Sequence, residues 1–86
     1  MPTLSTFFGI VIRMYYDDHS PPHFHAYYGS SSAQVAIDSL EVLSGVLPKR
    51  VLALVIEWAI SHRQELRDNW QLACDHQPLA SIDPLE

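Results

Sequence analysis

The stretch of residues 8–29, FGIVIRMYYDDHSPPHFHAYYG, decides the fold class, because two alternating runs flank a loop that contains two prolines. An apolar period of two is typical of a β-strand, so we predict one strand at residues 8–16 and a second at residues 23–29. The intervening residues 17–22 must form a loop, because acidic residues favour turns and proline has no N–H for a sheet ladder.

The residues that follow extend the sheet and then change their period. Residues 33–38 alternate again and predict a third strand, and residues 41–43 predict a short fourth one. After Pro48 the apolar residues recur at three- and four-residue steps, which is the pattern of one face of an α-helix. The predicted fold is therefore α+β, with a three- to four-stranded antiparallel meander sheet packed by one long C-terminal helix over residues 48–74.

Two features refine this prediction. The tetrapeptide SHRQ at residues 61–64 has the form of a capping box, so a helix that is kinked there is the alternative to a continuous helix. We prefer the continuous helix because its apolar stripe keeps its phase. The acidic residues 75–86 predict a loosely packed tail. Residues 1–86 are thus expected to form a single domain, with the sheet at residues 8–45 and the helix before the tail.

Composition excludes several classes of protein. The chain has 86 residues, enough for one domain, and is 48% hydrophobic and 17% charged, as ordinary globular proteins are. Its formal net charge of −5 has the wrong sign for bulk binding of nucleic acid. The near-apolar run at residues 51–60 is shorter than the roughly 17 to 25 residues of a membrane-spanning helix. A lone cysteine, Cys74, and a start without signal-peptide features predict a cytoplasmic protein with no membrane segment.

The residues suited to acid–base chemistry are predicted to share one face of the sheet. Side chains at positions i and i+2 of a strand point the same way, so His23, His25 and Tyr27 should project together into water, beside Arg13 and Tyr15. Imidazoles exchange protons near neutral pH, and a guanidinium stabilises a developing anion. The five residues would therefore suit metal-free phosphodiester cleavage. The alternative is that they form the solvated polar face of a half-exposed sheet.

The same stretch also has the composition of a metal site. Asp17, Asp18, His19, His23 and His25 place five potential ligands within nine residues. A His-x-His pair can hold one ion from one face of a strand, and the loop would supply a third ligand from Asp18 or His19. The candidate site for a divalent transition metal is therefore Asp18, His19, His23 and His25. The alternative is a protein without a cofactor, in which the two acids only cap the turn.

The first half of the predicted helix suggests a partner. Residues 51–60 are apolar on every side of the helix apart from Glu57. A helix of this kind is covered on every side, by its own sheet on one flank and by another surface elsewhere. We therefore expect a homodimer that forms through this helix.

Motifs spread over most of the chain resemble one known family. They are PTL at residues 2–4, FGIVIRMYYDDH at 8–19, PPHFHA at 21–26, LPKR at 47–50, EWA at 57–59 and Trp70. Together they resemble the bacterial family called domain of unknown function 4160, of which PPHFHA is the most specific mark. The resemblance implies a short bacterial protein, encoded beside another small protein in an arrangement like that of toxin–antitoxin pairs. It implies no established activity.

Charge, size and this resemblance lead to two functional expectations. The first is a protein-interaction module of a toxin–antitoxin-like or stress-response pair, whose partner is a small protein encoded by a neighbouring gene. The second is a small ribonuclease or metal-binding protein that uses the His-x-His face of the strand.

Overall fold

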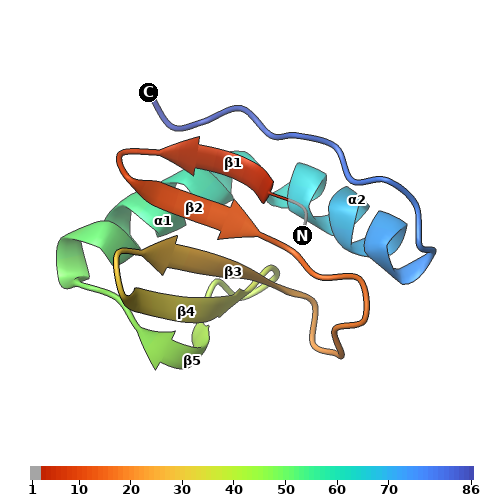
Figure 1. Ribbon diagram of the computed structural model, residues 1–86, viewed down its shortest axis with the longest axis horizontal. Helices are drawn as coiled ribbons and strands as arrows, with labels where there is room; N and C mark the ends of the chain where they lie inside the picture. Colours follow the sequence, from red (N-terminus) through yellow and green to blue (C-terminus); the bar gives the residue numbers. More distant parts are fainter. Residues whose placement is uncertain (1–2) are drawn as a thin grey trace.

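The computed structural model describes residues 3–86 and contains one five-stranded sheet and two helices. The elements are β1 (Thr3–Phe7), β2 (Ile10–Arg13), β3 (His23–Tyr28), β4 (Ser31–Ala36), β5 (Val42–Val46), α1 (Lys49–Ser61) and α2 (Arg63–Cys74). All neighbouring strands pair antiparallel in chain order, and both helices lie on one face of the sheet (Figure 1). The α+β class and the antiparallel meander are therefore confirmed. Residues 1–2 of the predicted domain lie outside the described residues.

The sheet begins earlier than predicted. Phe8, placed in the first strand by the sequence, has a φ of 48° and Gly9 has a φ of 79°. Positive φ at two consecutive positions is characteristic of a tight hairpin turn, and this turn joins β1 to β2. The sheet thus has five strands and starts at Thr3, where three to four strands starting at residue 8 were expected.

The predicted continuous helix is wrong, and the chain breaks where the alternative placed the kink. α1 ends at Ser61 and α2 begins at Arg63, with His62 between them at φ −123° and ψ 22°. No side chain caps the start of α2, so the capping-box pattern of the sequence is not formed. Instead, the His62 side chain bonds Glu65 through Nδ1 and Oε1 at 2.6 Å.

The prediction of a loosely packed tail is also wrong. The backbone N–H of Ile82 donates to the carbonyl oxygen of Leu4 at 2.8 Å, and the Ile82 side chain is 4% exposed. The Asn69 side chain, on α2, donates to the carbonyl of Ala80 at 3.0 Å and accepts from its N–H at 2.7 Å. Figure 1 shows the tail running back along α2 and then beside the outer edge of β1. The last residues therefore form part of the packed domain.

The core lies between the sheet and the helices. The Trp58 side chain, on α1, is fully buried and packs against Phe24 at a ring-centroid distance of 5.9 Å and against Phe7 at 5.4 Å. Phe24 and Ala26, two even-numbered residues of β3, are both buried in this core. Within residues 3–86, neither helix is long and apolar enough to cross a membrane. The odd-numbered residues of β3 lie on the other face of the sheet, where the candidate site is found.

Candidate metal centre

The site lies where the loop between β2 and β3 returns to the sheet. Asp18 lies in this loop, and His23 and His25 lie at the start of β3. Pro22 directly precedes the strand, and because proline offers no N–H, it suits the strand's threshold. Figure 1 shows α2 extending beyond the ends of β2 and β3, next to this loop.

Three potential ligands converge on one point. The Asp18 Oδ2 atom lies 2.9 Å from His23 Nε2 and 2.9 Å from His25 Nε2. One ligand atom from each of these residues lies within 4.8 Å of the other two. The other carboxylate oxygen, Asp18 Oδ1, accepts a hydrogen bond from the His19 backbone N–H at 3.3 Å, which helps to orient the carboxylate toward the imidazoles.

His23 is sealed from solvent, with its Nε2 atom facing the carboxylate. The side chain is 3% exposed, and its ring packs against Trp70 of α2 at a centroid distance of 5.3 Å. Its Nδ1 atom donates to the carbonyl oxygen of Pro21 at 2.8 Å. Nε2, however, makes no hydrogen bond within residues 3–86, although Asp18 Oδ2 is close. In the neutral ring, a proton on Nδ1 leaves a lone pair on Nε2 that points toward the site.

His25 occupies the open side of the cluster. Its Nε2 bonds Asp18 Oδ2, and its side chain is 15% exposed. The ring of Tyr15 meets the imidazole edge-on at a centroid distance of 4.6 Å, and Tyr27 lies parallel to it at 6.3 Å. These aromatic contacts leave the imidazole little freedom to rotate.

A shallow depression gives access to the cluster from solvent. Its volume is about 370 Å³, and its lining consists of Tyr15, Tyr16, Asp17, Asp18 and His25. The depression therefore has one carboxylate and one imidazole of the cluster in its wall.

The electrostatics of the cluster favour an ionised carboxylate. Burial by itself raises the pKa of Asp18, but the hydrogen bond from His25 and the positive charge that His23 and His25 carry whenever they are protonated outweigh it. The pKa of Asp18 is consequently lower than that of an ordinary aspartate. A carboxylate that stays ionised beside two imidazoles is a suitable ligand for a cation.

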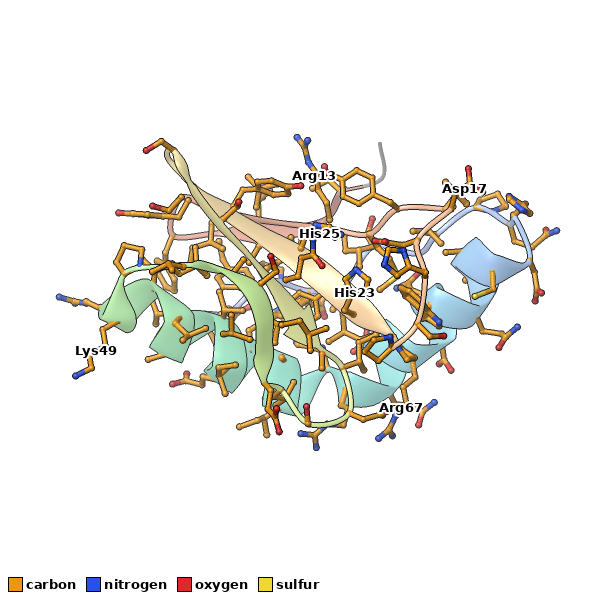
Figure 2. The ribbon with its side chains drawn as sticks, turned by 90° about the horizontal axis from the view of Figure 1, so that it is seen from below. Arg13, Asp17, His23, His25, Lys49 and Arg67 are labelled. Carbon is orange, nitrogen blue, oxygen red and sulfur yellow. The ribbon has the colours of Figure 1, made fainter. Side chains whose placement is uncertain are left out.

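The structure splits the residues predicted for acid–base chemistry. Arg13, Tyr15, His25 and Tyr27 share the polar face, but the expectation that His23 projects into water is wrong, because the loop and Trp70 cover it. The Arg13 guanidinium carbon lies 5.7 Å from the centre of the Tyr27 ring, and Figure 2 shows the guanidinium directed away from both histidines.

The two tyrosines of this face form a pair of their own. The hydroxyl groups of Tyr15 and Tyr27 are hydrogen-bonded at 2.5 Å. Burial, followed by this hydrogen bond, raises the pKa of Tyr27 to about 12. Tyr27 is therefore a protonated phenol at neutral pH, available as a hydrogen-bond donor.

The predicted metal set shrinks from four residues to three. The His19 side chain is 93% exposed, and its Nδ1 lies 3.8 Å from Asp18 Oδ1, outside the cluster. Asp17 is exposed, and its label in Figure 2 lies at the outer rim of the loop. Two contributors were absent from the sequence-based set. The carbonyl of Pro21 has no side-chain signal, and Trp70 carries only the signal of a packed helix residue.

Comparison with known proteins gives a family but no function. A family model with the description "Domain of unknown function (DUF4160)" matches residues 9–71, a range that contains the whole cluster and Trp70. No curated protein and no solved structure matches the chain.

Proposed function

This chain belongs to the family described as Domain of unknown function (DUF4160), whose description assigns no activity, and we propose its function from the cluster itself. The protein binds one divalent transition-metal ion through Asp18, His23 and His25. The remaining coordination positions of the ion face the depression beside Tyr15 and Tyr16, where water or a small ligand can reach it.

The observation that carries the proposal is the unsatisfied nitrogen of His23. With the Nδ1 proton donated to Pro21, the buried Nε2 and the half-buried Asp18 Oδ2 are two acceptors 2.9 Å apart. A buried polar atom without a partner costs about 1–3 kcal/mol, and two facing lone pairs also repel each other. A positive charge between His23 Nε2 and Asp18 Oδ2 gives the nitrogen a partner and removes the repulsion between the lone pairs. A metal ion at this position can also bind His25.

The Pro21 carbonyl orients His23 in the way that hydrogen-bond acceptors commonly orient a metal-binding histidine. Histidines that bind metals commonly donate their other ring N–H to a carbonyl or carboxylate, which fixes the tautomer and the orientation of the ring. His23 has this bond before any ion is considered. Trp70 holds the same ring from the side of α2. The ligand atom is thus preorganised by the fold.

The distances also suit an ion. Metal–nitrogen and metal–oxygen bonds of about 2.0–2.2 Å place neighbouring ligand atoms roughly 2.9–3.5 Å apart. Asp18 Oδ2 is 2.9 Å from both imidazole nitrogens, so an ion requires only small shifts of these side chains. Two imidazoles and one carboxylate suit zinc, iron(II), cobalt(II) or nickel(II), whereas calcium and magnesium prefer oxygen ligands.

Three protein ligands define an open site. Structural zinc sites are usually closed by four protein ligands, whereas catalytic sites keep one position for water or substrate. A metal ion at such a position lowers the pKa of bound water and acts as a Lewis acid. This supports a small metalloprotein with hydrolytic capacity. The ribonuclease and the toxin–antitoxin-like interaction module remain predictions.

A proton is the competing source of positive charge. If His23 carries a second proton, it forms an ion pair with Asp18, and the cluster needs no metal. The two arrangements respond oppositely to added metal, because an imidazolium has no lone pair to offer. Metal binding at neutral pH therefore separates them.

The test is a calorimetric titration of the full chain, treated with chelator and then freed of it, with zinc chloride. The expected result is one ion per chain, with Asp18→Asn and His25→Gln each weakening binding by at least about tenfold. His19→Gln and His76→Gln are the matched controls, since both remove exposed imidazoles outside the cluster. Absence of binding in the wild-type protein, or equal weakening in the controls, would overturn the proposal. Circular dichroism checks that each variant folds.

A further inference from the structure

The two edges of the sheet differ in what covers them. At the β1 edge, the C-terminal tail runs alongside the strand, and the Ile82 N–H donates to the Leu4 carbonyl. At the other edge, β5 pairs with β4 and with no other strand of residues 3–86. The outward backbone groups of β5 are therefore available to another strand.

β5 is exposed along its whole length, and three of its five residues are large and apolar. All five of its residues are exposed, with Val42 at 40%, Leu43 at 43% and Val46 at 80%. Natural edge strands are commonly protected by lysine, proline or an inward-pointing charge. The sequence of β5, VLSGV, contains none of these, and its pairing with β4 has one irregularity, opposite Gln34 and Val35. An exposed edge that lacks lysine, proline and an inward-pointing charge indicates a pairing surface.

The charges at the two ends of β5 are complementary to each other. Glu41 directly precedes the strand, and Lys49 and Arg50 follow its end at the start of α1. None of these three side chains forms an ion pair among the described residues, whereas nearby Asp38 is already paired with Arg67 at 2.8 Å. When two β5 strands run antiparallel, the acidic end of each strand meets the basic end of the other.

We propose that a second copy of this chain pairs antiparallel with β5, so that two sheets join into one continuous sheet across a two-fold axis. In such an interface each residue contacts its counterpart reciprocally, which requires a surface complementary to itself. The segment that runs from Glu41, just before β5, to Arg50, at the start of α1, is complementary to itself in this way. The apolar side chains of Val42, Leu43 and Val46 leave water at the same interface.

This proposal moves the expected dimer from the helix to the strand. Leu52, Leu54 and Ile56 of α1 pack against the chain's own core, and Ile60, at 59% exposure, is the single large apolar residue that the described part of α1 leaves fully open. The helix surface therefore offers little for a second copy to cover. The interface does not depend on the metal centre.

The experiment measures the mass of the full-length protein over a range of concentrations by sedimentation equilibrium. The wild-type protein is expected to be a dimer, and Val46→Lys is expected to be a monomer. Ile60→Lys is the matched control, because it places the same charge on an exposed apolar residue of α1, and it should remain dimeric. A monomeric wild type, or a dimer that Ile60→Lys but not Val46→Lys dissociates, would overturn the proposal.

A second pair of variants tests the antiparallel register without touching the strand. Glu41→Lys and Arg50→Glu should each raise the dimer dissociation constant by about tenfold, because each variant brings like charges together at both ends of the interface. An equimolar mixture of the two restores both attractions, so the mixed dimer should form with near wild-type affinity. Failure of the mixture to recover affinity, with both variants folded, would contradict antiparallel self-pairing.

Discussion

Asp18 Oδ2 lies 2.9 Å from the buried His23 Nε2, and yet this nitrogen makes no hydrogen bond. The reason is that the proton of the neutral His23 ring is on the opposite side, where Nδ1 donates to the Pro21 carbonyl. The fold has thus placed a lone pair and a carboxylate oxygen face to face. Such a contact is stable when a cation joins it, and this relationship is the basis of the proposed metal centre.

The tautomer of His23 gives the first prediction. In the metal-free protein above neutral pH, nitrogen NMR should show the Nδ1-protonated tautomer, with Nε2 unprotonated. Addition of zinc should then shift the Nε2 signal strongly and the Nδ1 signal little, because the bond to Pro21 is kept. A proton on Nε2 with a bare Nδ1 would contradict the hydrogen bonding described for this ring.

The packed tail gives the second prediction. Ile82→Ala should lower the free energy of unfolding by about 2–5 kcal/mol, because it empties a site in which the side chain is 4% exposed. Urea denaturation monitored by tryptophan fluorescence measures the change. Ser81→Ala, at the exposed neighbouring position, is the control and should stay within about 0.5 kcal/mol of the wild type. Equal stability of the two variants would mean that the tail does not belong to the core.

The tyrosine pair gives the third prediction. Burial and the bond to Tyr15 raise the pKa of Tyr27 to about 12, from an ordinary value of 10.0. Because the folded pKa is the higher one, the protonated phenol contributes stability below pH 10, and this contribution is lost as the pH rises toward 12. Of the four tyrosines in the chain, one should therefore ionise late in an absorbance titration.

Two phenylalanine variants identify that tyrosine. Tyr27→Phe should remove the late ionisation and leave a smaller loss of stability at high pH. Tyr28→Phe, at an exposed position of the same strand, is the control and should keep the late ionisation. The assignment would be incorrect if the late step survived in Tyr27→Phe.

The strands that the sequence predicted were those whose apolar period is regular. β2, β3 and β4 alternate cleanly, and the pairing of β3 with β4 follows from the tight turn between them. β1 escaped prediction because Leu4 and Ser5 are both buried, so its period is broken by an irregularity in its pairing with β2. β1 has only five residues, so one interruption leaves too little alternation between buried and exposed side chains to indicate a strand.

The continuous helix was preferred over the kinked one because the apolar period does not change at the break between α1 and α2. Val55 and Ala59 on α1, and Leu66 and Ala73 on α2, are all buried in the same core. The apolar stripe therefore continues through the break, although the backbone does not. The tail was misjudged because backbone groups of Ala80, Ile82 and Asp83 hold it to the domain, and side-chain composition does not report such bonds.

The metal ligands were predictable from local spacing, but their burial was not. Asp18, His23 and His25 are brought together by one short loop and one strand, so sequence proximity was enough. The cover over His23 comes from Trp70, which is far along the chain on α2. His19 is adjacent to a ligand in sequence, but the turn directs it outward, and such a direction depends on loop geometry that spacing does not reveal.

X-ray absorption at the zinc edge of the loaded, full-length protein tests the central claim most directly. The predicted spectrum shows two imidazole nitrogens and a carboxylate oxygen around the ion, with its remaining coordination supplied by water. His23→Ala should lose one imidazole contribution, whereas His19→Gln should leave the spectrum unchanged. An ion bound by one imidazole or none, or a spectrum that changes with His19 and not with His23, would contradict the proposed centre.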